Sequence, residues 1–147
     1  KTGFPDIESA MGRYLDRLKH YAPIDVHHLK AEKITHGTNE NTVRARESER
    51  IEKLYNRQGH LAVLDQTGRE FDSPGLSRFL QKLLDTGVSD IWMAIGGPVG
   101  VSEELKNKAD TVISLSKMTL AHDLARLVLL EQIYRAFTIM RGEPYHK

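Results

Sequence analysis

Three short apolar runs of the chain are each followed by residues that could bind a small molecule. The segments are "LDQTG" (64–68), "IGGPVG" (95–100) and "LSKMTL" (115–120). If each run is a strand of an open α/β sheet, the segments lie beyond the carboxyl ends of the strands, where such sheets bind ligands. We expect them to line one pocket. Each also has a plain structural interpretation: Asp65 as a turn former, the glycines as turn residues and Thr119 as the N-cap of the next helix.

The glycine-proline turn is a poor phosphate site. Pro98 removes one backbone N–H donor from the middle of the turn, and the glycines fit neither GxxxxGK[ST] nor GxGxxG. Ser102 is a credible N-cap, and Glu103 and Glu104 then place two carboxylates in the first turn of a helix. The pattern favours a neutral or cationic ligand that touches backbone groups, with an ordinary tight turn as the alternative.

The remaining reactive side chains give few signatures. The seven histidines have no metal-ligand spacing, no nucleophile motif is present, and the absence of cysteine excludes disulfides and thiolate catalysis. The tail "RGEPYHK" is different, because Gly142 and Pro144 should end a helix and leave Tyr145, His146 and Lys147 projecting. Such a tail needs something to hold it, and a partner subunit could do so.

The elements that must position these residues alternate between helix and strand. Apolar spacing predicts a helix over residues 7–21 ended by Pro23, and a strand over 24–29. An exposed loop follows over 30–41. A highly charged helix should come next over 42–59, with its charges on a solvated face, Gly59 as its stop, and an inward face made of Val43, Ile51, Leu54 and Tyr55.

The second half of the chain reads as a β-α-β unit with a further strand and a long helix. Strands are predicted over 60–65, 90–95 and 111–116, and helices over 73–87 and 121–140. This alternation predicts a parallel sheet with helices on both faces. Apolar residues go nearly all the way round the last helix. One sheet face cannot cover them all, so we expect a homodimer with this helix at the contact, burial within one chain being the alternative.

Composition narrows the class of protein. A chain of 147 residues forms one domain, 1–147, with 39% apolar and 28% charged residues, as in soluble globular proteins. The net charge of +1 does not indicate a nucleic-acid partner, so any contact with RNA must come from a local group of basic residues. There is no membrane span and no signal peptide in the sequence, and we expect a cytoplasmic protein.

Four segments together carry a family resemblance: "LDQTG", "IGGPVG", "SLSKMTLAHDLARLVLLEQIYRAF" and the terminal "YHK". They resemble the ribosomal RNA large-subunit methyltransferase H family, which belongs to the SPOUT class, and the likeness is dense over residues 61–147. The resemblance implies a homodimer that uses S-adenosylmethionine to methylate N3 of a pseudouridine in helix 69 of 23S ribosomal RNA on assembled ribosomes. It also implies a C-terminal trefoil knot, which general topology rules would not predict.

The resemblance also implies a site. The methyl donor should be bound, mostly through backbone groups, by Leu64, Gly96, Leu115, Ser116, Lys117, Met118, Thr119 and Leu120. His146 is the candidate base for the N3 proton, with Tyr145 shaping the pocket. Arg135 and Lys147, and more weakly Arg126, could contact RNA phosphate or the developing anion. Arg135 could instead simply pair with Glu131 one turn earlier.

One departure from the family concerns the start of the chain. Family members begin with a short apolar strand that ends in a Gly-Lys turn, whereas this sequence starts at about that turn with "KTGF". We therefore expect the first strand to be missing before residue 1. Two other functions stay open: a non-catalytic ribosome-binding assembly factor, and a SPOUT methyltransferase with another RNA target. The terminal "YHK" argues against the second, and the intact "LSKMTL" against the first.

Overall fold

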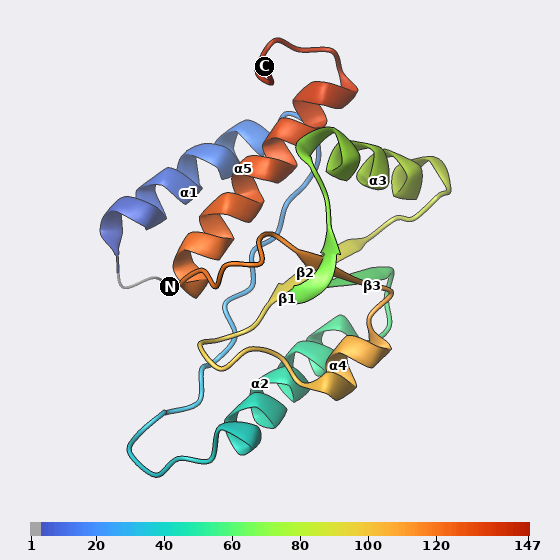
Figure 1. Cartoon of the computed structure of the whole chain (residues 1–147). Helices are drawn as coiled ribbons and strands as arrows, with labels where there is room; N and C mark the ends of the chain where they lie inside the picture. Colours follow the sequence, from blue (N-terminus) through green and yellow to red (C-terminus); the bar gives the residue numbers. More distant parts are fainter. Residues whose placement is uncertain (1–3) are drawn as a thin grey trace. The chain divides into compact units, whose positions relative to one another are not determined.

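The computed structural model describes residues 4–147, which contain five helices and three strands (Figure 1). In chain order these are α1 (Pro5–Leu18), α2 (Glu40–Tyr55), β1 (His60–Glu70), α3 (Ser73–Asp85), β2 (Ile91–Ile95), α4 (Glu103–Lys108), β3 (Thr111–Ser114) and α5 (His122–Met140). They form two compact units. The helical unit holds residues 4–27, 71–87 and 123–147, and the sheet unit holds 28–70 and 88–122.

The sheet unit is built on three parallel strands in the order β2-β1-β3. Leu64 of β1 lies opposite Ile95 of β2 and also opposite Ile113 of β3. Beyond Leu64 the register to β3 shifts, so that Arg69 also pairs with Ile113. The predicted parallel sheet flanked by helices is therefore confirmed, with β1 extending to Glu70 instead of ending at residue 65.

The core of the sheet unit lies where α2 and α4 pack on the strands. Leu61 and Val63 of β1 pack with Tyr55 of α2, Leu105 of α4 and Val101. Leu61 and Val63 are two residues apart and so point to the same side of the strand. Figure 1 shows α2 and α4 side by side next to the strands. This packing fixes the chain on either side of the 95–102 turn.

The inward face of α2 differs from the prediction. Val43 and Tyr55 are buried as expected, but Leu54 is 38% exposed, while Glu47 and Ser48 are buried. The stripe 43-47-51-55 follows an i, i+4 spacing, and Leu54 falls outside it. The prediction gave Glu47 to a solvated face because it treated every charge of the helix alike.

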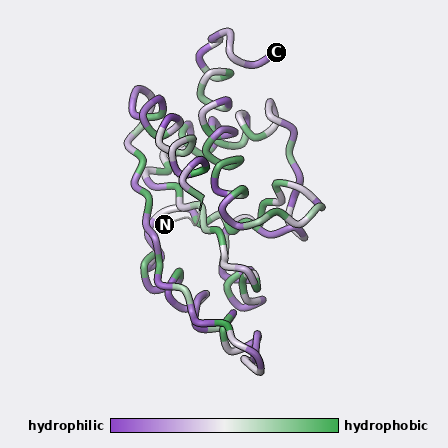
Figure 2. Tube along the Cα trace, turned by 90° about the vertical axis from the view of Figure 1, so that its left-hand side faces the viewer, coloured by the Kyte–Doolittle hydropathy of each residue, from purple (hydrophilic) through white to green (hydrophobic). Residues whose placement is uncertain are grey.

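The helical unit holds α1, α3 and α5. Met11 and Leu18 of α1 are buried against Leu130 of α5, and half-buried aliphatic and aromatic side chains surround them. On another side of α5 the Ser77 hydroxyl of α3 donates to the carbonyl oxygen of Ala136 at 2.8 Å. Figure 2 shows hydrophilic and hydrophobic residues alternating along the helices, as expected of elements with one covered side. Part of the apolar surface of α5 is thus buried within its own chain.

One predicted strand and two predicted helix ends were wrong. Residues 24–29 form no strand: Val26 and Leu29 are exposed, so their weak alternation defines no buried face. Helix α1 ends at Leu18 rather than near residue 21. Helix α2 ends at Tyr55, because Asn56 adopts a left-handed conformation with φ of 48° and serves as the cap in place of Gly59.

Three further expectations concern the start of the chain, membrane spans and metal sites. Lys1–Gly3, which we compared with the family's Gly-Lys turn, lie outside the described residues. Across residues 4–147, no helix has the length and apolar character needed to cross a membrane. Within the same range, no group of three or more histidine, aspartate or glutamate side chains is placed to hold a metal ion.

Candidate functional site

The three segments meet at one edge of the sheet unit, although residues 64–68 lie within β1 and do not follow it. The strands are parallel and neighbours in the order β2-β1-β3, and Leu64 is in register with Ile95 and Ile113, so residues 64–68 lie beside the carboxyl ends of β2 and β3. Residues 64–68, 95–100 and 115–120 therefore share this position, which we call the strand-end edge. All the residues expected to bind the methyl donor lie on it.

The glycine-proline turn is closed by its own backbone. The Gly100 N–H donates to the Gly97 carbonyl oxygen at 3.0 Å, with Pro98 between them and Gly100 at a φ of +81°. At Gly96 an added Cβ would lie 2.8 Å from Val101 Cγ1 and 2.9 Å from the Gly100 carbonyl carbon. The chain thus approaches itself so closely that only glycine fits at position 96. One amide is consumed by the turn and Pro98 has none, which agrees with the expectation that no phosphate cradle forms here.

Side chains of α2 bind the backbone around this turn. Arg44 Nε donates to the Val99 carbonyl oxygen at 2.8 Å, and the Ser102 N–H donates to Ser48 Oγ at 2.9 Å. Ser102 in turn caps α4 as predicted, because its hydroxyl accepts from the Leu105 N–H. The turn is therefore held by polar groups from a neighbouring helix.

Buried Glu47 lies behind the same turn. Its Oε2 accepts the Glu32 N–H at 2.9 Å, and a Cβ added to Gly97 would meet its Oε1 at 2.7 Å. Oε1 is buried and accepts no hydrogen bond from the described residues. Sequence reasoning missed Glu47 and Ser48. The only available signal was their spacing of four and five residues from Val43.

The segment after β3 is an irregular loop stabilised by serine side chains. The Ser114 hydroxyl donates to the Ser116 carbonyl oxygen at 3.0 Å, and the Met118 N–H donates to Ser116 Oγ at 2.9 Å. Thr119 is not the N-cap of the last helix, because α5 starts only at His122. Its hydroxyl instead donates to Gln66 Oε1 at 2.9 Å and joins the loop to β1.

The ionised groups near the strand-end edge include several carboxylates. Lys106 Nζ lies 3.5 Å from Asp65 Oδ2 and 2.7 Å from Glu103 Oε1. Burial raises the pKa of Asp65, but hydrogen bonds from Thr67 and the charge of Lys106 outweigh it, so the net pKa is lowered. The pKa of Lys106 is raised, chiefly by its hydrogen bond to Glu103. Asp65, Val99 and Lys106 line an open pocket of about 410 Å³.

The groups at the strand-end edge fit a ligand that carries a sulfonium cation and no phosphate. Carboxylates lie next to the turn, and Gly96 and Gly97 have no side chains to cover its backbone. Met118 has an apolar side chain that is 75% exposed. A phosphate would meet Asp65 and Glu103 instead of a row of free amides. The residues present are therefore compatible with S-adenosylmethionine at the strand-end edge.

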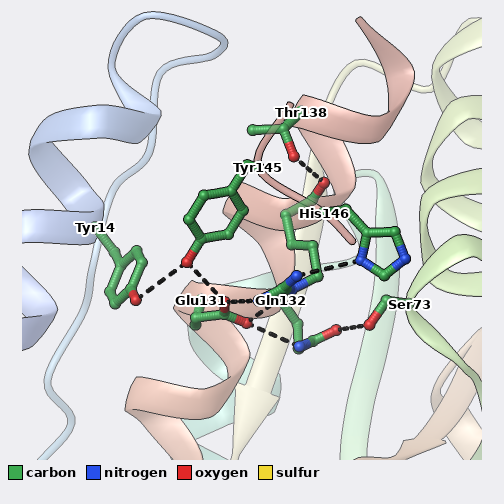
Figure 3. Close-up of polar contacts among 8 residues, drawn as sticks. Tyr14, Ser73, Glu131, Gln132, Thr138, Tyr145 and His146 are labelled. Atoms are coloured by element: carbon green, nitrogen blue, oxygen red, sulfur yellow. Dashed lines mark hydrogen bonds and ion pairs between the residues drawn. The ribbon is translucent and has the colours of Figure 1, made fainter. Parts of the chain in front are cut away.

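The second set of expected site residues lies in the helical unit. Gly142 adopts a φ of +66° after the last residue of α5, which ends the helix as predicted and turns the tail back along it. The Tyr145 hydroxyl donates to Glu131 Oε2 at 2.9 Å, and Arg135 Nη1 lies 3.2 Å from His146 Nδ1 (Figure 3). Arg135, Tyr145 and His146 are therefore brought together.

Arg135 forms the pairing with Glu131 that was the structural alternative, and it also contacts His146, while its expected contact with RNA stays a prediction. Its Nη2 donates to Glu131 Oε2 at 2.6 Å, while its Nη1 contacts His146. We call Tyr14, Glu131, Arg135, Tyr145 and His146 the tail network. Tyr14 enters it because its hydroxyl lies 3.4 Å from that of Tyr145. The structure thus holds the tail with α1 and α5 of its own chain.

Charge is retained inside the tail network. Burial raises the pKa of Glu131, but the hydrogen bonds from Arg135 and Tyr145 outweigh this and lower the net pKa. The hydrogen bond to Glu131 raises the pKa of Arg135, and burial together with contacts to Tyr14 and Glu131 raises that of Tyr145. Glu131 and Arg135 therefore stay ionised at neutral pH and Tyr145 stays a hydrogen-bond donor.

The two weaker candidates differ in their surroundings. Arg126 pairs with buried Asp123 at 3.2 Å, so its guanidinium already has a structural partner. Lys147 is exposed at the end of the chain. The sequence predicted the pairing of Glu131 with Arg135 as an alternative, but the contacts of Tyr14 and Glu131 with Tyr145 were missed.

Comparison with known proteins identifies the family of this chain. Residues 1–146 match the family described as predicted SPOUT methyltransferase. The chain is 51% identical to ribosomal RNA large subunit methyltransferase H of Syntrophobacter fumaroxidans, over 100% of this chain and 94% of that protein. It is 41% identical to the protein of that name from Geobacter sulfurreducens, over 99% of this chain and 94% of the relative. The chain belongs to the ribosomal RNA large-subunit methyltransferase H family, a group of S-adenosylmethionine-dependent enzymes of the SPOUT class.

Proposed function

We propose that this protein transfers the methyl group of S-adenosylmethionine to N3 of a pseudouridine in helix 69 of 23S ribosomal RNA, on the assembled ribosome. The observation that carries this proposal is the 51% identity, over the whole chain, to a protein named ribosomal RNA large subunit methyltransferase H. The retained glycine turn and the ordered tail support it, because a non-catalytic assembly factor would need neither.

The strand-end edge is proposed to bind the donor. Leu64, Gly96 and residues 115–120 would hold it, mostly through backbone groups, as the family resemblance implies. The donor supplies a methyl group on a positively charged sulfur. The protein's task there is positioning, because in-line transfer to nitrogen gains most of its rate from holding the two reacting atoms in line. A turn closed by its own hydrogen bonds and braced by α2 suits this task.

The tail network is proposed to serve the nucleophile. The N3–H of a uracil-type base is a weak acid, so groups that favour its anion raise the rate. His146, with Tyr145 and Arg135 beside it, is our candidate for this role, and Lys147 would contact RNA phosphate. Arg126 is the weaker candidate because it already pairs with Asp123.

The assembly and topology follow the family. We propose a cytoplasmic homodimer with α5 at the contact, a trefoil knot in the C-terminal half and helices on both faces of the sheet. Support for the contact comes from apolar side chains of α5 that α1 and α3 leave accessible, with Leu124 40% exposed and Val128, Ile139 and Met140 partly exposed.

A methylation assay tests this function. Purified protein is incubated with ribosomes that lack the modification and with donor carrying a labelled methyl group, and the labelled nucleoside is then mapped. We expect label at N3 of one pseudouridine in helix 69, and none on ribosomes in which that position is an ordinary uridine. Label elsewhere in the RNA would favour another SPOUT target. No label, with ribosome binding intact, would favour the assembly factor.

A further inference from the structure

His146 is held by a partner that can only donate hydrogen bonds. The guanidinium of Arg135 reaches His146 through Nη1, 3.2 Å from Nδ1. An arginine side chain carries five N–H donors, has no acceptor and stays protonated in proteins. The lone pair on Nδ1 must therefore accept this bond. In a neutral imidazole whose Nδ1 is an acceptor, the hydrogen is on Nε2.

The arginine has little freedom to turn away. Two of its nitrogens bind Glu131, Nη2 at 2.6 Å and Nε at 3.4 Å, and its guanidinium carbon lies 4.8 Å from the centre of the Tyr145 ring. Such a two-pronged contact fixes the plane of the guanidinium. The Nη1 that remains is the one aimed at His146.

Glu131 is itself held from several sides. Its Oε2 accepts from the Tyr145 hydroxyl at 2.9 Å, and its Oε1 accepts from Gln132 Nε2 at 2.8 Å (Figure 3). Gln132 in turn accepts from the Ser73 hydroxyl of α3 at 2.6 Å. The charged and titratable groups of the tail network around His146 are thus Arg135, Glu131, Tyr145 and Tyr14. The chain of contacts from α3 through α5 to the tail sets the orientation of the imidazole.

We infer that His146 serves methyl transfer as a hydrogen-bond donor through Nε2–H, and that Arg135 is the positioning residue that enforces this tautomer. This inference rests on the proposed function and changes the role first expected for His146. A proton added to Nδ1 would oppose an Arg135 donor and break their hydrogen bond. Nε2 already carries a hydrogen and cannot accept the N3 proton in this arrangement.

The reaction then balances as follows. The N3 proton leaves to hydroxide in solvent, which leaves an anion whose charge is shared between N3 and the two flanking carbonyl oxygens. The His146 Nε2–H donates to one of these oxygens and stabilises the anion. N3 then forms the new bond to the methyl carbon as the bond from that carbon to sulfur breaks, and the neutral thioether leaves. No proton passes through the histidine.

A direct test reads the tautomer without any turnover. In protein labelled with ¹⁵N at histidine, two-bond proton-nitrogen correlations distinguish the two neutral tautomers from the imidazolium, and His146→Gln identifies the signals that belong to residue 146. We expect a single neutral form with hydrogen on Nε2 at pH 7.5 in the wild type. In Arg135→Met we expect both neutral tautomers. An Nδ1–H form or an imidazolium in the wild type overturns the inference.

A kinetic test compares two substitutions at residue 146. The Gln side chain has an N–H donor but cannot take up a proton, whereas Ala offers neither. With ribosomes under single-turnover conditions, we expect His146→Ala to lower the rate by about 100-fold, the usual cost of removing one such donor. His146→Gln should recover at least about tenfold of that loss, a difference of about 1.4 kcal/mol in the barrier.

The dependence on pH completes the test. The wild-type rate should rise with pH as the N3 proton is lost to solvent, and the rate of His146→Gln should follow pH with the same profile, because no proton passes through residue 146. If His146→Gln is as slow as His146→Ala, or if its pH profile differs in shape from that of the wild type, the donor role is wrong. If wild-type protein fails to methylate ribosomes, the proposed function fails and the donor role of His146 fails with it, while the tautomer measurement still decides whether Arg135 fixes the neutral form of His146.

Discussion

The strand-end edge and the tail network are stabilised in opposite ways. At the edge, side chains of α2 bind backbone groups: Arg44 binds the Val99 carbonyl and Ser48 binds the Ser102 amide. In the tail network, side chains bind each other, as in the contacts of Arg135 with Glu131 and His146. The first arrangement shapes the glycine-proline turn and constrains the residue type there mainly at glycine. The second depends on each functional group that takes part.

This difference predicts which substitutions break each region. Adding a methyl group should damage the edge, where the backbone approaches itself, and removing a functional group should damage the network. The two regions should also affect different measurements, because binding of the methyl donor should depend on the strand-end edge and methyl transfer on the tail network. The following variants test the contrast.

The largest effect is expected from Gly96→Ala. Its Cβ would lie within 2.9 Å of both Val101 Cγ1 and the Gly100 carbonyl carbon, so the turn must move. Such overpacking costs about 1–3 kcal/mol of stability, and we expect the affinity for S-adenosylmethionine to fall at least tenfold. Thermal unfolding and calorimetric titration measure the two effects.

The matched control is Gly12→Ala in α1. No atom lies within 4 Å of its built Cβ, and in a helix alanine is favoured over glycine by about 0.5–1 kcal/mol. This variant should be slightly more stable and bind the donor unchanged. Equal losses of donor affinity in the two variants would contradict the assignment of the edge.

An intermediate effect is expected from Glu131→Gln. It removes the charge that fixes Arg135 and accepts from Tyr145. A hydrogen bond to a charged group contributes about 1.5–3 kcal/mol, so single-turnover methylation should fall about 10- to 100-fold, while donor affinity stays within about twofold. Glu49→Gln is the control, because its pairing with Lys53 has the same spacing on an exposed helix surface. A comparable loss in both variants would show that the network has no special role.

The smallest effect is expected from Ser48→Ala. It leaves the partly buried Ser102 amide without its acceptor, which costs at most about 1–3 kcal/mol, the range for a fully buried group. Leu54→Ala on the same helix should lower the free energy of unfolding by less, because Leu54 is exposed. Denaturant unfolding of both variants gives the comparison. A larger cost for Leu54→Ala would restore the inward face that apolar spacing alone predicted.

The sequence was most informative where one physical signal dominated. Strong apolar runs predicted all three strands, their alternation with helices predicted that the sheet is parallel, and Ser102 predicted the start of α4. The strand predicted over residues 24–29 was wrong because the weak alternation there does not create a buried face. Glu47 and Ser48 were missed because their burial depends on backbone groups 15 and 54 residues away, which no local pattern reveals. The tail network was partly visible as the Glu131 and Arg135 spacing, whereas its contact with Tyr14 spans 131 residues.

The most direct test of the whole account measures donor binding and methyl transfer in the same two proteins, the wild type and His146→Ala. Calorimetric titration with S-adenosylmethionine, with ATP and NAD as controls, gives the first quantity, and labelling of ribosomes gives the second. The account predicts that both proteins bind the methyl donor with affinities within about twofold, and that His146→Ala transfers methyl about 100-fold more slowly. Full activity of His146→Ala, or failure of the folded wild type to bind the donor, would contradict it.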